Sequence, residues 1–316
     1  MSAAHSTVLE LGLTPWDFSS LSAVSLSAQA AFAEALGYQS FWLPESHFNA
    51  QAIPDPLMLL ASVAAATRTI RLATTSYLLP LRNPLLAAEQ VAVLDHLSGG
   101  RVTLGIGRGY SRETLRAFAI DPSAKRELFE WAYHLMLRAW RGEGVSLHDD
   151  GTAAVRVEPR PLQRPHPPVW VAAFGPKALQ QVGRLGLPYL ASPIETLSEL
   201  CANFAAYDAA VAAAGHPPIT VRPVMRTVFV SANRSAVNAL RARLANIKLP
   251  RGLATSLQVE DWAIVGDAAY VRDKIAEYRA ALAMSQLIVT RLRVEDVDEA
   301  VLRGSVVRIA ELIADL

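Results

Sequence analysis

The sequence predicts a (β/α)8 barrel, and three observations lead to that fold class. Eight short apolar segments alternate with stretches of helical periodicity, the order expected of a parallel sheet whose strands are joined by helices. The expected strands are apolar throughout, as in a sheet covered on both faces. A chain of 316 residues, 52% hydrophobic and 19% charged, can fill one large core. A doubly wound open sheet is the alternative.

The expected elements follow in order along the chain. The strands are short apolar runs bounded by proline, glycine or polar turns, and we expect them at residues 8–13, 40–43, 70–75, 102–106, 169–172, 189–191, 221–230 and 286–292. The helices show apolar residues at helical spacing, and we expect them at residues 21–36, 56–66, 85–97, 125–140, a stretch ending at 184, 195–214, 235–246, 268–282 and 297–316. A polar loop is expected after Gly109.

Two segments exceed a minimal strand-helix repeat. Residues 145–168 hold Asp149-Asp150-Gly151 between alternating segments, and four prolines lie within residues 160–168. This pattern predicts a hairpin and then an extended path, in a surface insertion near the active-site mouth. Residues 248–261 have little periodicity and are the candidate lid. Both lie within a single expected domain, residues 1–316.

Composition excludes several classes of function. The formal net charge is +1 and no block of Lys and Arg occurs, so we expect no nucleic-acid partner. The longest apolar run, near residues 57–66, is too short to span a bilayer, and the amino terminus lacks a signal pattern, so we expect a cytoplasmic protein without membrane contact. No HExxH, paired CxxC or carboxylate cluster indicates a metal, and GxSxG is absent.

The stretch 69–110 reads as strand, helix, strand and organises the rest of the chain. Ligands of parallel sheets gather at the carboxyl ends of the strands. The residues that follow the two strands are Thr75 and Ser76, then Gly107, Arg108 and Tyr110. Small hydroxyl residues, glycines and one arginine would let a planar, phosphorylated ligand lie close to the backbone.

The glycines at positions 105, 107 and 109 are not a dinucleotide fingerprint, because that fingerprint requires glycine where Tyr110 stands. A glycine-rich turn of the barrel is the simpler interpretation. The expected strand 40–43 leads directly into Pro44-Glu45-Ser46-His47-Phe48. A carboxylate and an imidazole at the end of a barrel strand predict a catalytic site.

These motifs resemble the bacterial luciferase-like family of flavin-dependent oxidoreductases, a family of TIM barrels. The resemblance lies in WLPESHF, in LPLRNP with the following AEQVAVLDHLSGGR, and in the GIGRG turn. It implies a monooxygenase in which reduced FMN and O2 oxidise a small organic substrate. Two alternatives are hydride transfer with a deazaflavin coenzyme, and a non-catalytic flavin-binding or dimer-partner subunit.

The resemblance also implies cofactor contacts. Arg108 matches the family arginine that contacts the flavin phosphate, with a salt bridge at the barrel rim as the alternative, while Gly107 stands where luciferase carries cysteine. The loop 174–178 aligns with a second phosphate-binding segment that is acidic and hydroxyl-bearing in luciferase. Here it offers Phe174, Gly175, Lys177 and Ala178, so contacts would come from backbone N–H groups, or the loop is an ordinary turn.

For the chemistry, the resemblance points to the segment after residue 43. Luciferase has two consecutive histidines there; the one regarded as its base falls on Ser46, and only the second matches, as His47. We expect His47 to donate, accept or orient at the flavin, and Glu45 to orient His47, pair with an arginine or take part in the chemistry. A non-prolyl cis peptide is implied at Thr75-Ser76, against the flavin ring.

Two partners complete the expectation. Related proteins form dimers through the helices that correspond to residues 56–66 and 85–97, so we expect a homodimer. Because the chain shows neither a Rossmann unit nor a second domain, we expect a separate NAD(P)H:flavin reductase to supply reduced FMN.

Overall fold

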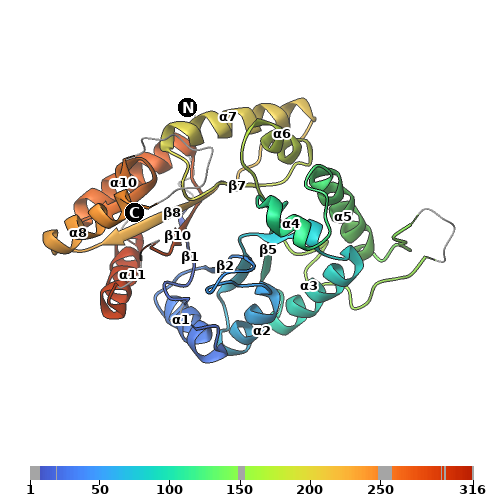
Figure 1. Cartoon of the computed structure of the whole chain (residues 1–316), viewed down its shortest axis with the longest axis horizontal. Coiled ribbons are helices and arrows are strands. Elements are labelled where there is room, and N and C mark those ends of the chain that lie inside the picture. Colours follow the sequence, from blue (N-terminus) through green and yellow to red (C-terminus); the bar gives the residue numbers. More distant parts are fainter. Residues whose placement is uncertain are drawn as a thin grey trace. The chain divides into compact units, whose positions relative to one another are not determined.

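The computed structural model describes residues 8–18, 20–148, 154–247, 258–292, 294 and 297–314 of the chain. The chain divides into two compact units. The first unit consists of Met1–Phe18, Phe32–Phe41 and Ala173–Leu316, and the second of Ser19–Ala31 and Trp42–Ala172. In both, parallel strands are joined by helices (Figure 1).

In the second unit, β5 is the central strand. It pairs in parallel with three neighbours, which are β3 (Arg71–Thr74), β4 (Tyr77–Leu78) and β6 (Val169–Ala172). Every residue of β5 (Val102–Gly107) is buried, as the uniformly apolar sequence of this strand predicts. The helices pack in succession along the unit, in the order α2 (Pro56–Ala66), α3 (Pro84–Ser98) and α5 (Lys125–Trp140) (Figure 1).

Helix α3 connects β3 to β5, and local signals fix both of its ends. The Asn83 side chain accepts hydrogen bonds from the N–H groups of Leu85 and Leu86 at 2.9 and 3.3 Å, and Pro84 is the first helical residue. Gly99 ends the helix with φ 68°, a left-handed conformation that favours glycine. The crossover therefore returns the chain to a parallel strand and brings the carboxyl ends of β3 and β5 to the same edge.

In the first unit, four strands pair in parallel in the order β1 (Glu10–Leu13), β10 (Gln286–Thr290), β8 (Pro223–Val230) and β9 (Ala263–Gly266). β2 (Ser40–Leu43) begins in this unit, where its first half pairs with β1, and β7 (Tyr189–Leu190) also belongs here. The helices that pack in succession are α6 (Pro176–Arg184), α7 (Leu197–Ala213), α10 (Ala268–Leu282) and α11 (Glu299–Ala314) (Figure 1). The helix α8 (Arg234–Ala245) also belongs to this unit, whereas α1 (Ala23–Ala35) begins in the second unit and ends in the first.

All eight expected strands are present in the expected order, which confirms the predicted alternation of strands and helices. β4, β9 and the 3-10 turn η1 (Leu79–Leu81) were not expected. The expectation of a loop after Gly109 is wrong, because α4 (Arg112–Ala117) forms there; its N-cap Ser111 accepts from the N–H of Thr114 at 3.0 Å. Six residues are too few to show helical periodicity.

The two predicted irregular segments are only partly described. In the segment 145–168, Val145 and Val155 form an antiparallel bridge, and the predicted turn at 149–151 lies outside the described residues. Gln163 anchors this segment to α3, since its backbone and side-chain N–H groups donate to the Asp95 carboxylate at 2.8 and 2.7 Å. Most of the candidate lid, 248–257, also lies outside the described residues, and its last residues belong to α9 (Val259–Trp262), where Val259 and Trp262 are buried.

Candidate active site

Glu45, just after β2 in the second unit, is the centre of a buried polar cluster. Its side chain is 0% exposed. One carboxylate oxygen, Oε1, contacts His47 Nε2 at 2.8 Å and accepts from Arg82 Nη1 at 2.7 Å, while Oε2 accepts from the N–H of Leu78 at 2.9 Å. Glu45 thus orients His47 and pairs with an arginine at the same time, which are two of the roles that the sequence predicted for it.

Two phenylalanine rings lie against His47. The Phe118 ring meets the imidazole edge-on at 4.9 Å between centroids, and the Phe48 ring lies 5.7 Å from the imidazole and 5.6 Å from Phe118. Phe48 is 70% exposed and has φ 60°, a left-handed conformation that a bulky residue rarely adopts and that is found mostly at functional sites. The imidazole, whose side chain is 8% exposed, therefore has an apolar wall on one side and a carboxylate on another.

The hydroxyl of Ser46 closes the loop that follows β2. It accepts a hydrogen bond from the N–H of Ile53 at 3.2 Å, and the N–H of Ser46 donates to the Ile53 carbonyl at 3.0 Å. The loop that carries Glu45 and His47 is held by this pair of bonds, so Ser46 supports the position of both side chains.

The Thr75-Ser76 peptide bond is cis, as the resemblance implied. It follows β3, and the N–H of Thr75 donates to the Leu43 carbonyl at 2.8 Å. Ser76 packs closely against Gly107 at the end of β5: a Cβ atom at position 107 would lie 2.9 Å from the Ser76 Cβ, closer than side-chain carbons approach in proteins. Glycine is therefore required at 107 as long as serine occupies 76.

Arg108 is the first of a group of cations at the carboxyl end of β5. Its Nη2 lies 3.5 Å from the Ala172 carbonyl, and its guanidinium lies 5.8 Å from the Phe129 ring. Burial and, to a smaller extent, the charge of Arg126 lower the pKa of Arg108 to about 10. Burial also lowers the pKa of Lys125, with added effects from Arg108, Arg126 and Arg112. Cations that depress one another's pKa values in this way favour an anion between them.

Lys125 and Arg126 escaped prediction from the sequence. They open α5, whose N-cap Ala124 makes no side-chain cap, and Lys125 Nζ donates to the Gly109 carbonyl at 2.8 Å. Two cations at the amino end of a helix oppose the helix dipole, and that conflict is the signal in the sequence that could have identified them. Arg82 also escaped prediction, because its contact with Glu45 joins residues 37 positions apart.

Tyr110, another predicted cofactor-binding residue, lies after the Gly109 turn and is 88% exposed.

The remaining predicted residues lie at the start of α6 in the first unit. Gly175 is the N-cap of α6 with φ 81°, and its carbonyl accepts from the N–H of Ala178 at 3.0 Å. Phe174 and Lys177 are exposed and the Ala178 side chain is buried. These residues form a helix start without a side-chain cap, which suits an anion held by backbone N–H groups.

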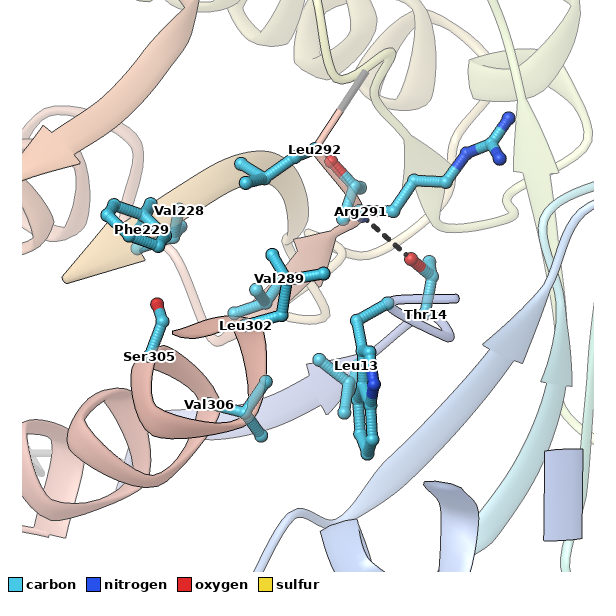
Figure 2. A pocket seen from close by; sticks show the side chains of 12 residues that line it. Leu13, Thr14, Val228, Phe229, Val289, Arg291, Leu292, Leu302, Ser305 and Val306 are labelled. Carbon is cyan, nitrogen blue, oxygen red and sulfur yellow. Dashed lines mark hydrogen bonds between the residues drawn. The ribbon is translucent and has the colours of Figure 1, made fainter. Parts of the chain in front are cut away.

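A separate small cavity in the first unit lies near the carboxyl ends of β1 and β10, beside α11 (Figure 2). The Thr14 hydroxyl accepts from the N–H of Arg291 at 3.0 Å, while the Arg291 side chain extends away from the cavity (Figure 2). Its volume of about 20 Å³ suffices for one water molecule, so the cavity is too small for a cofactor.

Among the helices that the structure describes, none is both long and apolar enough to cross a membrane. In the same part of the chain, no three His, Cys, Asp or Glu residues gather as metal ligands would.

Comparisons with known proteins identify the family of the chain. The family model described as luciferase-like monooxygenase matches residues 19–285. The alkanal monooxygenase alpha chain of the Kryptophanaron alfredi symbiont is 28% identical over 186 residues, which are 58% of this chain and 52% of that protein. Limonene 1,2-monooxygenase of Rhodococcus erythropolis is 34% identical over 118 residues, 37% of this chain and 30% of that protein. The chain therefore matches about half, or less, of the length of these relatives.

Solved structures match along nearly the whole chain. The oxygenating constituent of 3,6-diketocamphane monooxygenase from Pseudomonas putida, in complex with FMN, has a TM-score of 0.78 at 21% identity and covers 97% of this chain and 98% of its own. The coenzyme F420 dependent tetrahydromethanopterin reductase from Methanopyrus kandleri has a TM-score of 0.77 at 18% identity, over 98% and 99%. At these identities the likeness establishes the fold, which confirms the predicted fold class.

Proposed function

The chain belongs to the luciferase-like monooxygenase family, and from that premise we propose that it is a flavin-dependent monooxygenase that uses reduced FMN and O2 to oxidise a small apolar substrate. The observation that carries the proposal is the group of cations around Arg108, whose lowered pKa values mark a place for an anion next to the Thr75-Ser76 peptide and Gly107. FMN carries a phosphate monoester and a planar ring, and these two parts match the cations and the close-packed backbone.

Different residues of the site contact the phosphate and the ring of FMN. Arg108, Lys125 and Arg126 hold the phosphate through charge-assisted hydrogen bonds. Gly107 and the Thr75-Ser76 peptide lie against the ring. Bound reduced FMN supplies the activation of O2. Tyr110, exposed after the Gly109 turn, covers the cofactor from the solvent side.

The apolar wall next to His47 indicates the substrate. The Phe48 and Phe118 rings are 70% and 38% exposed, and they lie beside an imidazole that can form a hydrogen bond. An apolar substrate would cover both rings and exclude water from the reacting centre. His47 then donates or accepts one hydrogen bond at the ligand, and Glu45 fixes the orientation of its ring.

Two partners belong to the proposal. Reduced FMN comes from a separate NAD(P)H:flavin reductase, because the cation group suits a single phosphate and the GIGRG turn lacks the dinucleotide pattern.

The protein is a homodimer through α2 and α3. These helices expose four large apolar side chains, namely Met58, Leu86, Val93 and Leu97.

The oxygenase proposal is tested with isotopic oxygen. The protein, FMN, NADH, a reductase and a panel of apolar ketones, aldehydes and alkenes are incubated under ¹⁸O₂, and products are analysed by mass spectrometry. Transfer of one ¹⁸O atom that depends on the protein supports the proposal. Rapid FMN reduction by NADH or NADPH without the reductase would remove the two-component part, and turnover only with reduced deazaflavin coenzyme would favour hydride transfer instead.

Assembly is tested by light scattering at micromolar concentration. We expect the mass of a dimer for the wild type and of a monomer for Leu97→Glu. Val24→Glu is the matched control, because Val24 is an 81% exposed residue of α1, in the same unit, and its substitution should leave the dimer intact. A monomeric wild type would exclude the homodimer.

A further inference from the structure

We propose that Arg82 is a positioning residue for His47: by neutralising Glu45 it keeps the imidazole neutral, with its proton on Nε2, so that Nδ1 is presented to a ligand as a hydrogen-bond acceptor. The inference rests on the proposed function only for the identity of that ligand. The protonation state is a property of the protein alone.

The three contacts of Glu45 determine which atom of His47 carries the proton. The N–H of Leu78 at 2.9 Å and the guanidinium of Arg82 at 2.7 Å can only donate, so both require acceptor oxygens. Glu45 forms a buried ion pair with Arg82, and the carboxylate of such a pair only accepts hydrogen bonds. The contact of 2.8 Å between Oε1 and His47 Nε2 is therefore a hydrogen bond donated by Nε2.

This donor assignment leaves Nδ1 as the second nitrogen of the ring. In the neutral imidazole it has a lone pair and accepts, whereas in the imidazolium it carries a proton and donates. Among the described residues, none forms a hydrogen bond with Nδ1. The chemistry that His47 can perform on a ligand therefore depends on whether the ring is neutral.

The balance of charge around the ring favours the neutral form. Glu45 carries one negative charge, and Arg82 places one positive charge on the same carboxylate oxygen that contacts the imidazole. The other titratable groups nearby are Tyr77, whose ring lies 4.0 Å from the Arg82 guanidinium, and Asp55, which acts on Tyr77. Burial raises the pKa of Tyr77 well above its usual value, so this phenol is uncharged. The facing rings of Phe48 and Phe118 add no charge.

Without Arg82 the same carboxylate would be buried with no other cation in contact with it. A protonated imidazole is then the nearest group that can compensate its charge, because an opposite charge at hydrogen-bond distance favours the charged form of the partner. Arg82 thus decides between two forms of His47. The Arg82 side chain is well placed for this, since it is 18% exposed and is packed on Tyr77.

The test is ¹⁵N NMR of the histidine ring nitrogens at pH 7, on the full chain without flavin. The His47 signals are assigned by their loss in His47→Gln. We expect the wild type to show a neutral ring with the proton on Nε2, and Arg82→Gln to show the imidazolium pattern, with both nitrogens protonated. Arg82→Lys restores a cation and should return the ring to the neutral pattern. Arg138→Gln is the matched control, because it removes the partner of Glu143, 3.0 Å away, on the exposed face of α5.

The wild-type spectrum alone can overturn the inference, if the ring is charged or carries its proton on Nδ1. A folded Arg82→Gln protein with an unchanged neutral ring would also overturn it. If that variant does not fold, Arg82→Met takes its place, because it removes the charge and keeps an apolar chain against Tyr77. A neutral ring with its proton on Nε2, unchanged from the wild type, then contradicts the inference. Failure to bind reduced FMN with the expected ring form intact would count against the proposed function and leave this inference standing.

Discussion

Strand β5 has an arginine at each end, and the two guanidinium groups lie in opposite kinds of surroundings. Arg101, before the strand, donates at 2.6–3.1 Å to five acceptors, which are the carbonyls of Ala64, Thr67, Ile70 and Ser98 and the Thr67 hydroxyl. Arg108, after the strand, lies 3.5 Å from the Ala172 carbonyl and close to Lys125 and Arg126, whose positive charges repel its own.

The comparison separates stability from function within one strand. At the amino end, the arginine satisfies the last carbonyls of α2 and the turn before β3, and so it closes the packing. At the carboxyl end, cations that lower one another's pKa lie together, an arrangement that an anionic ligand would stabilise. Each prediction below concerns one end of β5.

The largest effect is expected at the amino end. Arg101→Ala leaves several carbonyls at the end of α2 without their donor, and we expect a loss of about 3 kcal/mol or more in the free energy of unfolding. Urea denaturation followed by circular dichroism measures this change. The folded fraction should still bind reduced FMN with the wild-type dissociation constant. A loss below about 0.5 kcal/mol, the range of ordinary surface changes, would show that the network has little weight.

Arg108→Ala should weaken the binding of FMN and leave the stability of the protein unchanged, the reverse of the result expected for Arg101→Ala. We expect FMN binding to weaken by about 1.5 to 3 kcal/mol, the usual contribution of charge-assisted hydrogen bonds, because the substitution removes a donor to the phosphate. Anaerobic titration with reduced FMN measures the dissociation constant. The urea midpoint should not fall, since the remaining cations repel one another less. An unchanged dissociation constant would place the phosphate elsewhere.

Gly107→Ala tests the close packing beside Arg108. The added methyl group meets Ser76, and we expect a loss of about 1 to 3 kcal/mol in stability, as for other overpacked sites. Ser76→Gly in the same chain should recover most of it. Gly304→Ala is the matched control: it lies within α11, where an added methyl group would meet the flexible end of the Arg308 side chain at 4.0 Å, an ordinary contact, and it should stabilise by about 0.5 to 1 kcal/mol. Equal effects at 107 and 304 would contradict the close contact.

The smallest effect is in the pH dependence. The pKa of Arg108 is about 10 in the folded protein, against a usual value of 12.5, so between these values the unfolded chain binds more protons. The stability of the ligand-free protein should therefore rise slightly with pH in that window. A bound phosphate reverses the shift, so binding near pH 10 should take up protons. Calorimetry in two buffers of different ionisation enthalpy measures the uptake; proton release would contradict the anion site.

The sequence could predict those parts of the fold and the site that depend on neighbouring residues, but not those that depend on contacts between distant segments. The strands and the long helices were predictable because periodicity, proline and glycine signals are local. Glu45 and His47 were predictable because they follow a strand directly. Arg82 was not, since its contact with Glu45 joins residues distant in the chain. The helix α9 was missed because four residues carry no period.

The most direct test is the shift in the urea unfolding midpoint that saturating reduced FMN produces, measured anaerobically for the wild type, Arg101→Ala and Arg108→Ala. A ligand that binds only the folded state stabilises it by RT ln(1 + L/Kd), where L is the free ligand concentration, so at one fixed concentration the gain depends on the dissociation constant and not on the starting stability. We predict the same gain in stability for the wild type and Arg101→Ala, and a much smaller gain for Arg108→Ala. Equal gains in all three proteins would contradict the assignment of the carboxyl end of β5 to the cofactor.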